Sequence, residues 1–209
     1  MTTPRRWGDP TAGIPGRRLF VALPLPEDAA AAVAEVVDEV RAAGLPDGAR
    51  DVRWVRLDGL HLTLRFLGPT LEPRVQPTVE AVLDTARSAT PIDVELGGAG
   101  RFPPDGRPRT IWIGLTRGVD AVDALSRALS ERLVEAGWPL DGRPFRPHLT
   151  LARSDGVAVG PLVAERLVAA MAERRIRFDA DRLGLFESVT GGGPARYVPV
   201  TSAAIGATT

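Results

Sequence analysis

The chain has 209 residues, of which 44% are hydrophobic and 25% are charged, and these values are typical of a soluble globular protein. All 26 basic residues are arginine and no residue is cysteine, which excludes disulfides, thiolate metal sites, cysteine nucleophiles and lysine Schiff bases. Because 26 acidic residues balance the arginines, the surface cannot be basic overall, although a local basic cleft is compatible with this composition.

The first residues differ in character from the rest of the chain. Residues 1–16 are rich in turn formers and show no hydrophobic period, so we expect a tail that precedes one domain over residues 17–209. The apolar run that follows is too short for a signal sequence, and no run approaches the ~18 apolar residues that a membrane-spanning helix requires. We therefore expect a cytoplasmic, monomeric protein with no membrane partner.

The first half of the sequence predicts strands and helices in alternation. Valines that recur at intervals of three and four residues indicate a helix with one buried face, whereas short apolar runs between turn residues indicate strands. The predicted elements are a strand over residues 18–23, a helix that ends near Gly44, strands over 52–55 and 60–67, a helix that begins at Pro73 and a strand over 92–96.

The second half repeats this order after a stretch rich in glycine and proline. Residues 97–108 form that stretch, which we interpret as the boundary between two halves. The predicted elements beyond it are a strand over residues 110–115, a helix that ends at Gly137, a strand over 149–152, a helix that begins at Pro161, strand structure over 177–186 and a last strand over 197–200.

The tetrapeptide His-Leu-Thr-Leu occurs once in each half, at His61 and at His148, and these are the only histidines of the chain. With the repeated order of elements, this indicates a duplication whose halves cover about residues 18–97 and 109–187. We therefore predict an α+β fold with two lobes related by approximate two-fold symmetry, each with a mainly antiparallel sheet flanked by helices. Equivalent strands of the two lobes would bring both motifs to a central cleft.

Each motif carries residues suited to acid–base chemistry. Side chains alternate along a strand, so the histidine and the threonine share one face while the leucines face the core. Two histidines can serve as general acid and general base near neutral pH, because an unperturbed pKa of ~6.5 makes both protonation states available. The hydroxyl groups of Thr63 and Thr150 are candidates to donate hydrogen bonds to an oxyanion such as a phosphate.

The residue five positions after each histidine differs between the halves. It is Phe66 in the first half, a candidate to face a nucleobase, and Arg153 in the second, a candidate phosphate ligand. An odd offset points to the core face of a regular strand, so the second strand must end by Ala152 or contain a bulge. Arg65, at an even offset, is expected on the cleft face, whereas Trp112 is expected in the core or at the rim.

With these motifs, the sequence resembles the two-histidine phosphoesterase superfamily, and within it the bacterial and archaeal RNA 2′,3′-cyclic phosphodiesterases, once called 2′-5′ RNA ligases. The resemblance covers about residues 18–200. It depends mainly on two His-x-Thr motifs in similar contexts, with Arg153 after the second. The segments that carry it are RLFVALPLP, RWVRLDGLHLTLRFLG, PRTIWIGL, FRPHLTLAR, LFES and GPARY.

The resemblance implies a bilobal fold and an enzyme that needs no metal or other cofactor. The implied reaction is hydrolysis of the 2′,3′-cyclic phosphate of an RNA end or a nucleotide to a 2′-phosphate, with weak 2′-5′ RNA ligation as the reverse type of reaction. Phe66 and Arg65 are further candidates for contact with the base or the rest of the substrate. The residues that the resemblance assigns are the proton donor His61, the proton acceptor His148 and the phosphate ligands Thr63, Thr150 and Arg153.

Other functions are open on the residues alone. Within the superfamily, the alternatives are phosphodiesterase activity on 2′-5′-linked oligonucleotides or on small cyclic nucleotide esters. A cleft that binds RNA or nucleotides without turnover is a second alternative. A third is an iron site of two histidines and one carboxylate, with Asp155 or Glu187 as the third ligand.

Overall fold

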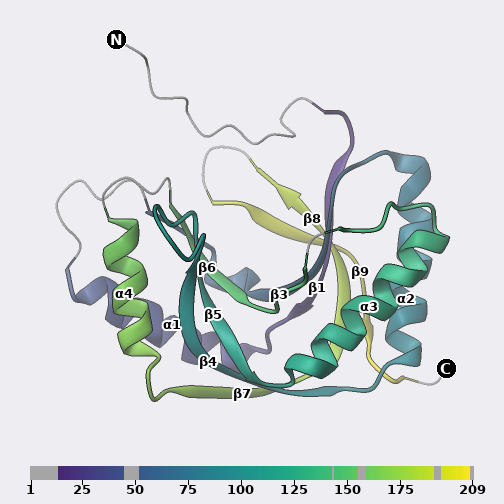
Figure 1. The fold of residues 1–209 in the computed structure, drawn as a ribbon. Helices are drawn as coiled ribbons and strands as arrows, with labels where there is room; N and C mark the ends of the chain where they lie inside the picture. Colours follow the sequence, from purple (N-terminus) through teal and green to yellow (C-terminus); the bar gives the residue numbers. More distant parts are fainter. Residues whose placement is uncertain (1–13, 45–51, 143, 155–158, 191–193, 208–209) are drawn as a thin grey trace, which may run out of the picture.

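The first half of the sequence folds into four strands and two α-helices. The computed structural model describes residues 14–44, 52–142, 144–154, 159–190 and 194–207 (Figure 1). The elements of the first half are β1 (Arg17–Pro24), α1 (Glu27–Ala42), β2 (Val52–Trp54), β3 (His61–Thr70), α2 (Val75–Ser88) and β4 (Ile92–Phe102), with short 3-10 turns η1 (Leu57–Gly59) and η2 (Glu72–Arg74).

The second half adds five strands and two α-helices. These are β5 (Thr110–Arg117), α3 (Val119–Glu135), β6 (Leu149–Ser154), α4 (Gly160–Ala170), β7 (Arg175–Ala180), β8 (Arg182–Val189) and β9 (Arg196–Ala204). Each strand and helix predicted from hydrophobic periodicity is present in the described residues, and the strand structure expected over 177–186 is divided between β7 and β8.

The glycine-rich boundary predicted over residues 97–108 begins inside a strand, because β4 continues to Phe102. A shift of register between β4 and β5 falls at Gly97 and Gly98, and Gly98 has a φ of 66°. Glycine adopts this left-handed conformation without the steric cost that a Cβ brings. The start of the predicted boundary was therefore wrong, since the glycines there form a bulge within a long strand.

All nine strands belong to one curved, antiparallel sheet in the order β7-β4-β5-β6-β3-β1-β8-β9, with β2 beside β6. The two halves of this sheet meet where β3 pairs with β6, through Leu62 and Leu149. The α+β class is confirmed, but the prediction of a separate sheet in each lobe is corrected. If each lobe had a separate sheet, β3 and β6 would be edge strands with unpaired backbone N–H and C=O groups. Their pairing gives hydrogen-bond partners to some of these groups.

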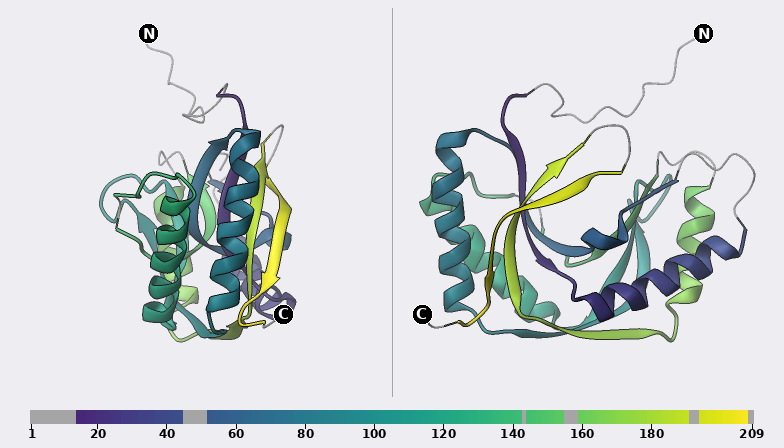
Figure 2. Two further views of the ribbon diagram at one scale, coloured as in Figure 1. Left: turned by 90° about the vertical axis from the view of Figure 1, so that its right-hand side faces the viewer. Right: turned by 180° about the vertical axis from the view of Figure 1, so that it is seen from behind.

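Each lobe contains elements from both halves of the sequence. β4 pairs with β5, and β8 pairs with β1. Helix α1 packs against α4, whereas α2 packs against α3, and the two pairs lie at opposite ends of the sheet (Figure 2). The boundary between the lobes is therefore not a boundary along the chain.

The core lies between the helices and one face of the sheet. In α1 the valines predicted to share a face are buried, and in β3 and β6 the leucines of both motifs are buried. Burial of one such side chain stabilises the fold by about 1.5–3 kcal/mol, so the leucine face cannot readily exchange with the polar face. Among the described residues, no helix is long and apolar enough to cross a membrane.

Candidate active site

The two His-Leu-Thr-Leu motifs lie side by side at the centre of the sheet. Leu62 pairs with Leu149 in antiparallel register, and both leucines are buried in the core. Their neighbours along each strand face the opposite side, where the register sets each histidine beside the threonine of the other motif. Diagonal neighbours on one face are roughly 7–8 Å apart, so His61 and His148 can both reach one phosphate-sized anion.

The same type of hydrogen bond holds both imidazoles. Nδ1 of His61 lies 2.6 Å from the carbonyl oxygen of Gly59, and Nδ1 of His148 lies 2.7 Å from that of Arg146. A carbonyl oxygen can only accept, so Nδ1 donates and carries the proton in each ring. In the neutral form, Nε2 is then the nitrogen that can take a proton, and both rings present it for proton transfer.

Aromatic rings enclose each histidine. The ring of His61 lies 4.8 Å from both Phe20 and Tyr197, with Tyr197 edge-on at 88°. The ring of His148 lies 5.1 Å from Phe102 and 6.2 Å from Trp112. These contacts restrict the rotation of both imidazoles and exclude water from one side of each ring.

Burial lowers the pKa of both histidines. Desolvation is the main cause for His61 and for His148, and the positive charge of Arg153 lowers both pKa values further, while the hydrogen bonds to carbonyl oxygens oppose the shift. Both imidazoles are therefore mostly neutral at pH 7 in the free protein. An anion bound between them would raise the pKa of each, because a negative charge favours the imidazolium.

Arg153 reaches the cleft because β6 contains a bulge. Ile111 pairs with Ala152 while the next residue of β5 pairs with Thr150, which leaves Leu151 without a partner in β5. Leu151 and Ala152 are consequently both buried, and Arg153 is exposed. The charge of Arg153 acts on both histidines, so the bulge brings this guanidinium to their side of the sheet.

β3 contains the equivalent bulge, which leaves Leu64 without a partner in β1 and reverses the two side chains that follow. The expectation that Arg65 lies on the cleft face was wrong, because Arg65 is 8% exposed. It donates a hydrogen bond to the carbonyl oxygen of Pro139 and lies 3.8 Å from the carboxylate of Asp141. Phe66 is 42% exposed, so the bulge presents this ring to solvent in place of the arginine.

The aromatic residues around the histidines were not assigned a role from the sequence. Tyr197 is the only tyrosine of the chain, and it contacts His61 from β9 at the far edge of the sheet. Trp112, expected in the core or at the rim, is half-buried, and its ring lies 6.2 Å from that of His148. A Cβ on Gly100 would lie 2.5 Å from the Trp112 ring, so the glycine leaves room for this ring. This pairing across β4 and β5 could not be recognised from the sequence alone.

Two pockets flank the pair of motifs. One of about 400 Å³ opens beside His61 and includes Asp58, Phe186 and Tyr197 in its wall. The other, of about 440 Å³, lies beyond Trp112 next to α4 and includes neither histidine. The pocket beside His61 is therefore the one that adjoins the pair of histidines.

The described residues contain no group of three or more histidine and acidic side chains that could hold a metal ion. Glu187 is one of the two candidates for the third ligand of an iron site, but it forms an ion pair of 2.9 Å with Arg17. Asp155, the other one, lies outside the described residues. The donor set at the motifs is two imidazoles, two hydroxyl groups and a guanidinium, which suits an anion better than a cation.

Comparisons with known proteins identify relatives of this chain. Residues 25–192 match the 2′-5′ RNA ligase superfamily. An RNA 2′,3′-cyclic phosphodiesterase of Geobacillus stearothermophilus is 33% identical over 134 residues, which are 64% of this chain and 41% of that protein. The chain thus spans less than half the length of this relative.

Two solved structures share the fold. TT0787 of Thermus thermophilus has a TM-score of 0.70 and 25% identity, over 90% of this chain and 98% of that one. Escherichia coli LigT complexed with 3′-AMP has a TM-score of 0.66 and 24% identity, over 90% of this chain and 98% of that one. At the identity of LigT, the likeness concerns the fold alone.

Proposed function

The chain belongs to the 2′-5′ RNA ligase superfamily, as its motifs predicted, and we propose that it is an RNA 2′,3′-cyclic phosphodiesterase. The proposed reaction is hydrolysis of a 2′,3′-cyclic phosphate, at an RNA end or on a nucleotide, to a 2′-phosphate. The observation that carries the proposal is the pairing of Leu62 with Leu149, because it sets two imidazoles on one face with Nε2 free of the backbone hydrogen bond. The Geobacillus relative carries this activity in its name.

Three side chains bind the phosphate in this proposal. The cyclic diester has one negative charge, spread over two non-bridging oxygens. The hydroxyl groups of Thr63 and Thr150 each donate a hydrogen bond to these oxygens, and the guanidinium of Arg153 adds charge-assisted hydrogen bonds. The position of Arg153 beyond the bulge supports this role, since its charge acts on both histidines.

Acid–base catalysis then opens the ring. Nε2 of His148 takes a proton from a water molecule as the water oxygen bonds to phosphorus. The bond between phosphorus and O3′ breaks while His61, which the bound anionic phosphate favours as the imidazolium, donates its Nε2 proton to O3′. The products are a 2′-phosphate and a free 3′-hydroxyl group. Proton exchange with solvent restores both rings, and the assignment of acid and base follows the family resemblance.

The proposed mechanism needs no metal, and it also allows ligation. If the 5′-hydroxyl group of a second RNA takes the place of water, the same displacement of O3′ forms a 2′-5′ linkage. Water is far more abundant than RNA ends, so hydrolysis is the expected main reaction and ligation a weak one.

Turnover of matched phosphodiesters tests the proposal. The purified protein is incubated with a 2′,3′-cyclic mononucleotide, an RNA with a 2′,3′-cyclic end, and 2′-5′- and 3′-5′-linked dinucleotides, and ³¹P NMR identifies the products. We expect turnover of the cyclic phosphates alone, with a 2′-phosphate as the product. Turnover of the 2′-5′ linkage alone would favour the alternative diesterase, and binding without any turnover would favour a binding module.

Treatment with a chelator tests whether the reaction proceeds without a metal ion. Because the site offers only two histidines and no cysteine, activity should persist after exhaustive treatment with a chelator. Loss of activity that one added metal ion restores would contradict the proposed mechanism.

A further inference from the structure

A second arginine lies directly opposite Arg153. β2 pairs with β6 in antiparallel register, and Arg53 is the partner of Arg153 in that ladder. The flanking residues Val52 and Ser154 are buried, whereas both arginines are exposed. Directly paired residues share one face of a sheet, so Arg53 lies on the same face as Arg153 and the two histidines.

Neither of these two arginines has a carboxylate partner within the described residues. Ion pairs do form at other arginines, including Arg17 with Glu187 and Arg177 with Glu95. Like charges directly opposite each other on a sheet are unfavourable, whereas two adjacent guanidinium groups bind a phosphate well. The pair Arg53 and Arg153 therefore has the chemistry of an anion site that is completed by a ligand.

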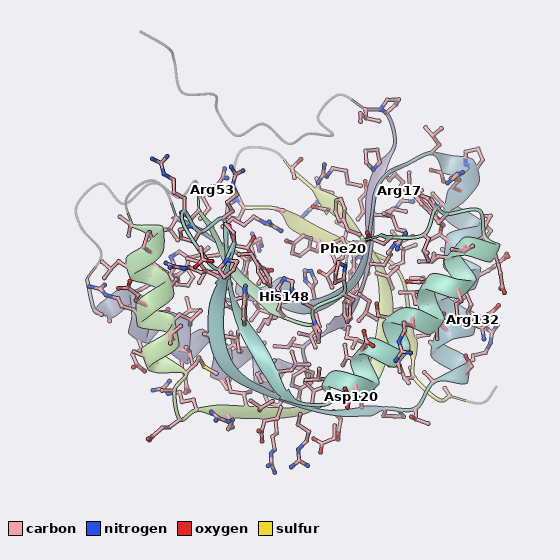
Figure 3. All side chains as sticks on the ribbon, in the orientation of Figure 1. Arg17, Phe20, Arg53, Asp120, Arg132 and His148 are labelled. Carbon is pink, nitrogen blue, oxygen red and sulfur yellow. The ribbon has the colours of Figure 1, made fainter. Side chains whose placement is uncertain are left out.

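The position of Arg53 separates it from the reacting phosphate. Thr150 pairs with Trp112 near the junction of the motifs, while the arginine pair lies beyond the bulge, one step further along β6. On one face of a strand, this step is roughly 7 Å. Figure 3 shows Arg53 above and to the left of His148. Arg153 extends from β6 itself and can reach the reacting phosphate across this step, whereas Arg53 extends from β2, one strand further, so we place Arg53 beside a neighbouring phosphate.

We propose that Arg53, beside Arg153, binds the phosphodiester on the 5′ side of the terminal nucleotide, so that the preferred substrate is an RNA end. This inference rests on the proposed function. A cyclic mononucleotide has no such second phosphate, so it gains nothing from Arg53. An RNA strand with a 2′,3′-cyclic end has one and binds more tightly through it.

The test compares two substrates that share the same terminal nucleotide. We measure kcat/KM of the wild type and of Arg53→Ala on a 2′,3′-cyclic mononucleotide and on a trinucleotide with that cyclic nucleotide at its 3′ end. The variant should lose about 10-fold on the trinucleotide, mainly in KM, because a charge-assisted hydrogen bond is lost. On the mononucleotide, the change should be less than about two-fold.

Arg132→Ala is the matched control. Arg132 is a half-buried arginine of α3 that donates to Ser88 at 3.1 Å, and Figure 3 shows it on the helix far from His148. This variant should leave kcat/KM unchanged on both substrates. On the trinucleotide, the slope of log KM against log salt concentration should also fall by about 0.7 for Arg53→Ala, since one phosphate contact on a single strand is lost. The slope for Arg132→Ala should equal that of the wild type.

An equal loss on both substrates would place Arg53 on the reacting phosphate and overturn the inference, as would no loss on either. If the wild type turns over neither substrate, the proposed function fails, and binding decides the inference separately. In that case, fluorescence anisotropy compares the affinity of a labelled trinucleotide with a 2′-phosphate end for the wild type and Arg53→Ala. Equal affinity of the two proteins would overturn the inference without any reference to catalysis.

Discussion

Leu62 and Leu149 form the one residue pair through which β3 and β6 join the two halves of the described sheet. Both side chains are buried, so this contact belongs to the core as well as to the ladder. The pair also sets the register between the two motifs, and with it the placement of His61 and His148 on the opposite face. Stability and the geometry of the candidate site therefore depend on the same contact.

Leu62→Ala should lower the free energy of unfolding by about 2–5 kcal/mol, because it leaves a cavity at this junction. Urea denaturation of the wild type and the variant measures the difference. Leu140→Ala is the control, since Leu140 is 74% exposed, and it should change the free energy of unfolding by less than about 0.5 kcal/mol. Similar losses for both variants would contradict the role given to Leu62.

Arg153→Ala should lower kcat/KM on a cyclic phosphate by about 10- to 100-fold, because charged hydrogen bonds to the phosphate are lost. Arg65→Met is the control, at the arginine that directly follows the first motif. Arg65 is buried against Pro139 and Asp141, so its replacement should lower stability by about 1–3 kcal/mol and leave kcat/KM nearly unchanged. If Arg65→Met instead reduced kcat/KM as much as Arg153→Ala, the correction made for Arg65 would fail.

The stability of the protein should fall on acidification through pH 6.5. The pKa values of His61 and His148 are lowered in the folded state, so the unfolded chain binds protons at a higher pH than the folded chain does. Each histidine therefore contributes a loss of stability that begins near its unfolded pKa of ~6.5 and grows as the pH falls toward its folded pKa.

Urea denaturation between pH 7.5 and pH 5.5 measures this loss. The double variant His61→Gln and His148→Gln has no imidazole to protonate, so its free energy of unfolding should change less over this range. A double variant that lost as much stability as the wild type would show that the two histidines titrate normally.

The roles of the two histidines can be separated by the leaving group. His61→Ala should lose about 10²–10⁴-fold on a ribose 2′,3′-cyclic phosphate, because the departing oxygen needs a proton. On a phosphodiester with a nitrophenolate leaving group, which needs no proton, much of that loss should be recovered. His148→Ala should recover little, since the attacking water must still be deprotonated.

Kinetics of both variants on both substrates decide the assignment. Rescue of His148→Ala in place of His61→Ala would exchange the two roles. A lack of rescue in either variant would mean that both histidines act mainly in phosphate binding.

Local interactions determined what the sequence alone could predict. The period of the valines in α1 specifies a helix with one buried face, and alternation over three residues places the histidine and threonine of each motif opposite the leucines. Both features depend on neighbours within a few residues. The order of elements, the α+β class and the pair of histidines could therefore be predicted without the structure.

Tertiary pairing decided the rest. The alternation expected for Arg65 fails because Leu64 has no partner in β1, and Arg153 is brought to the cleft because Leu151 has none in β5. A bulge is a mismatch between two strands, so it cannot be read from either strand alone. For the same reason, the contact of Tyr197 with His61 and the pairing of Arg53 with Arg153 appear only when distant segments lie side by side.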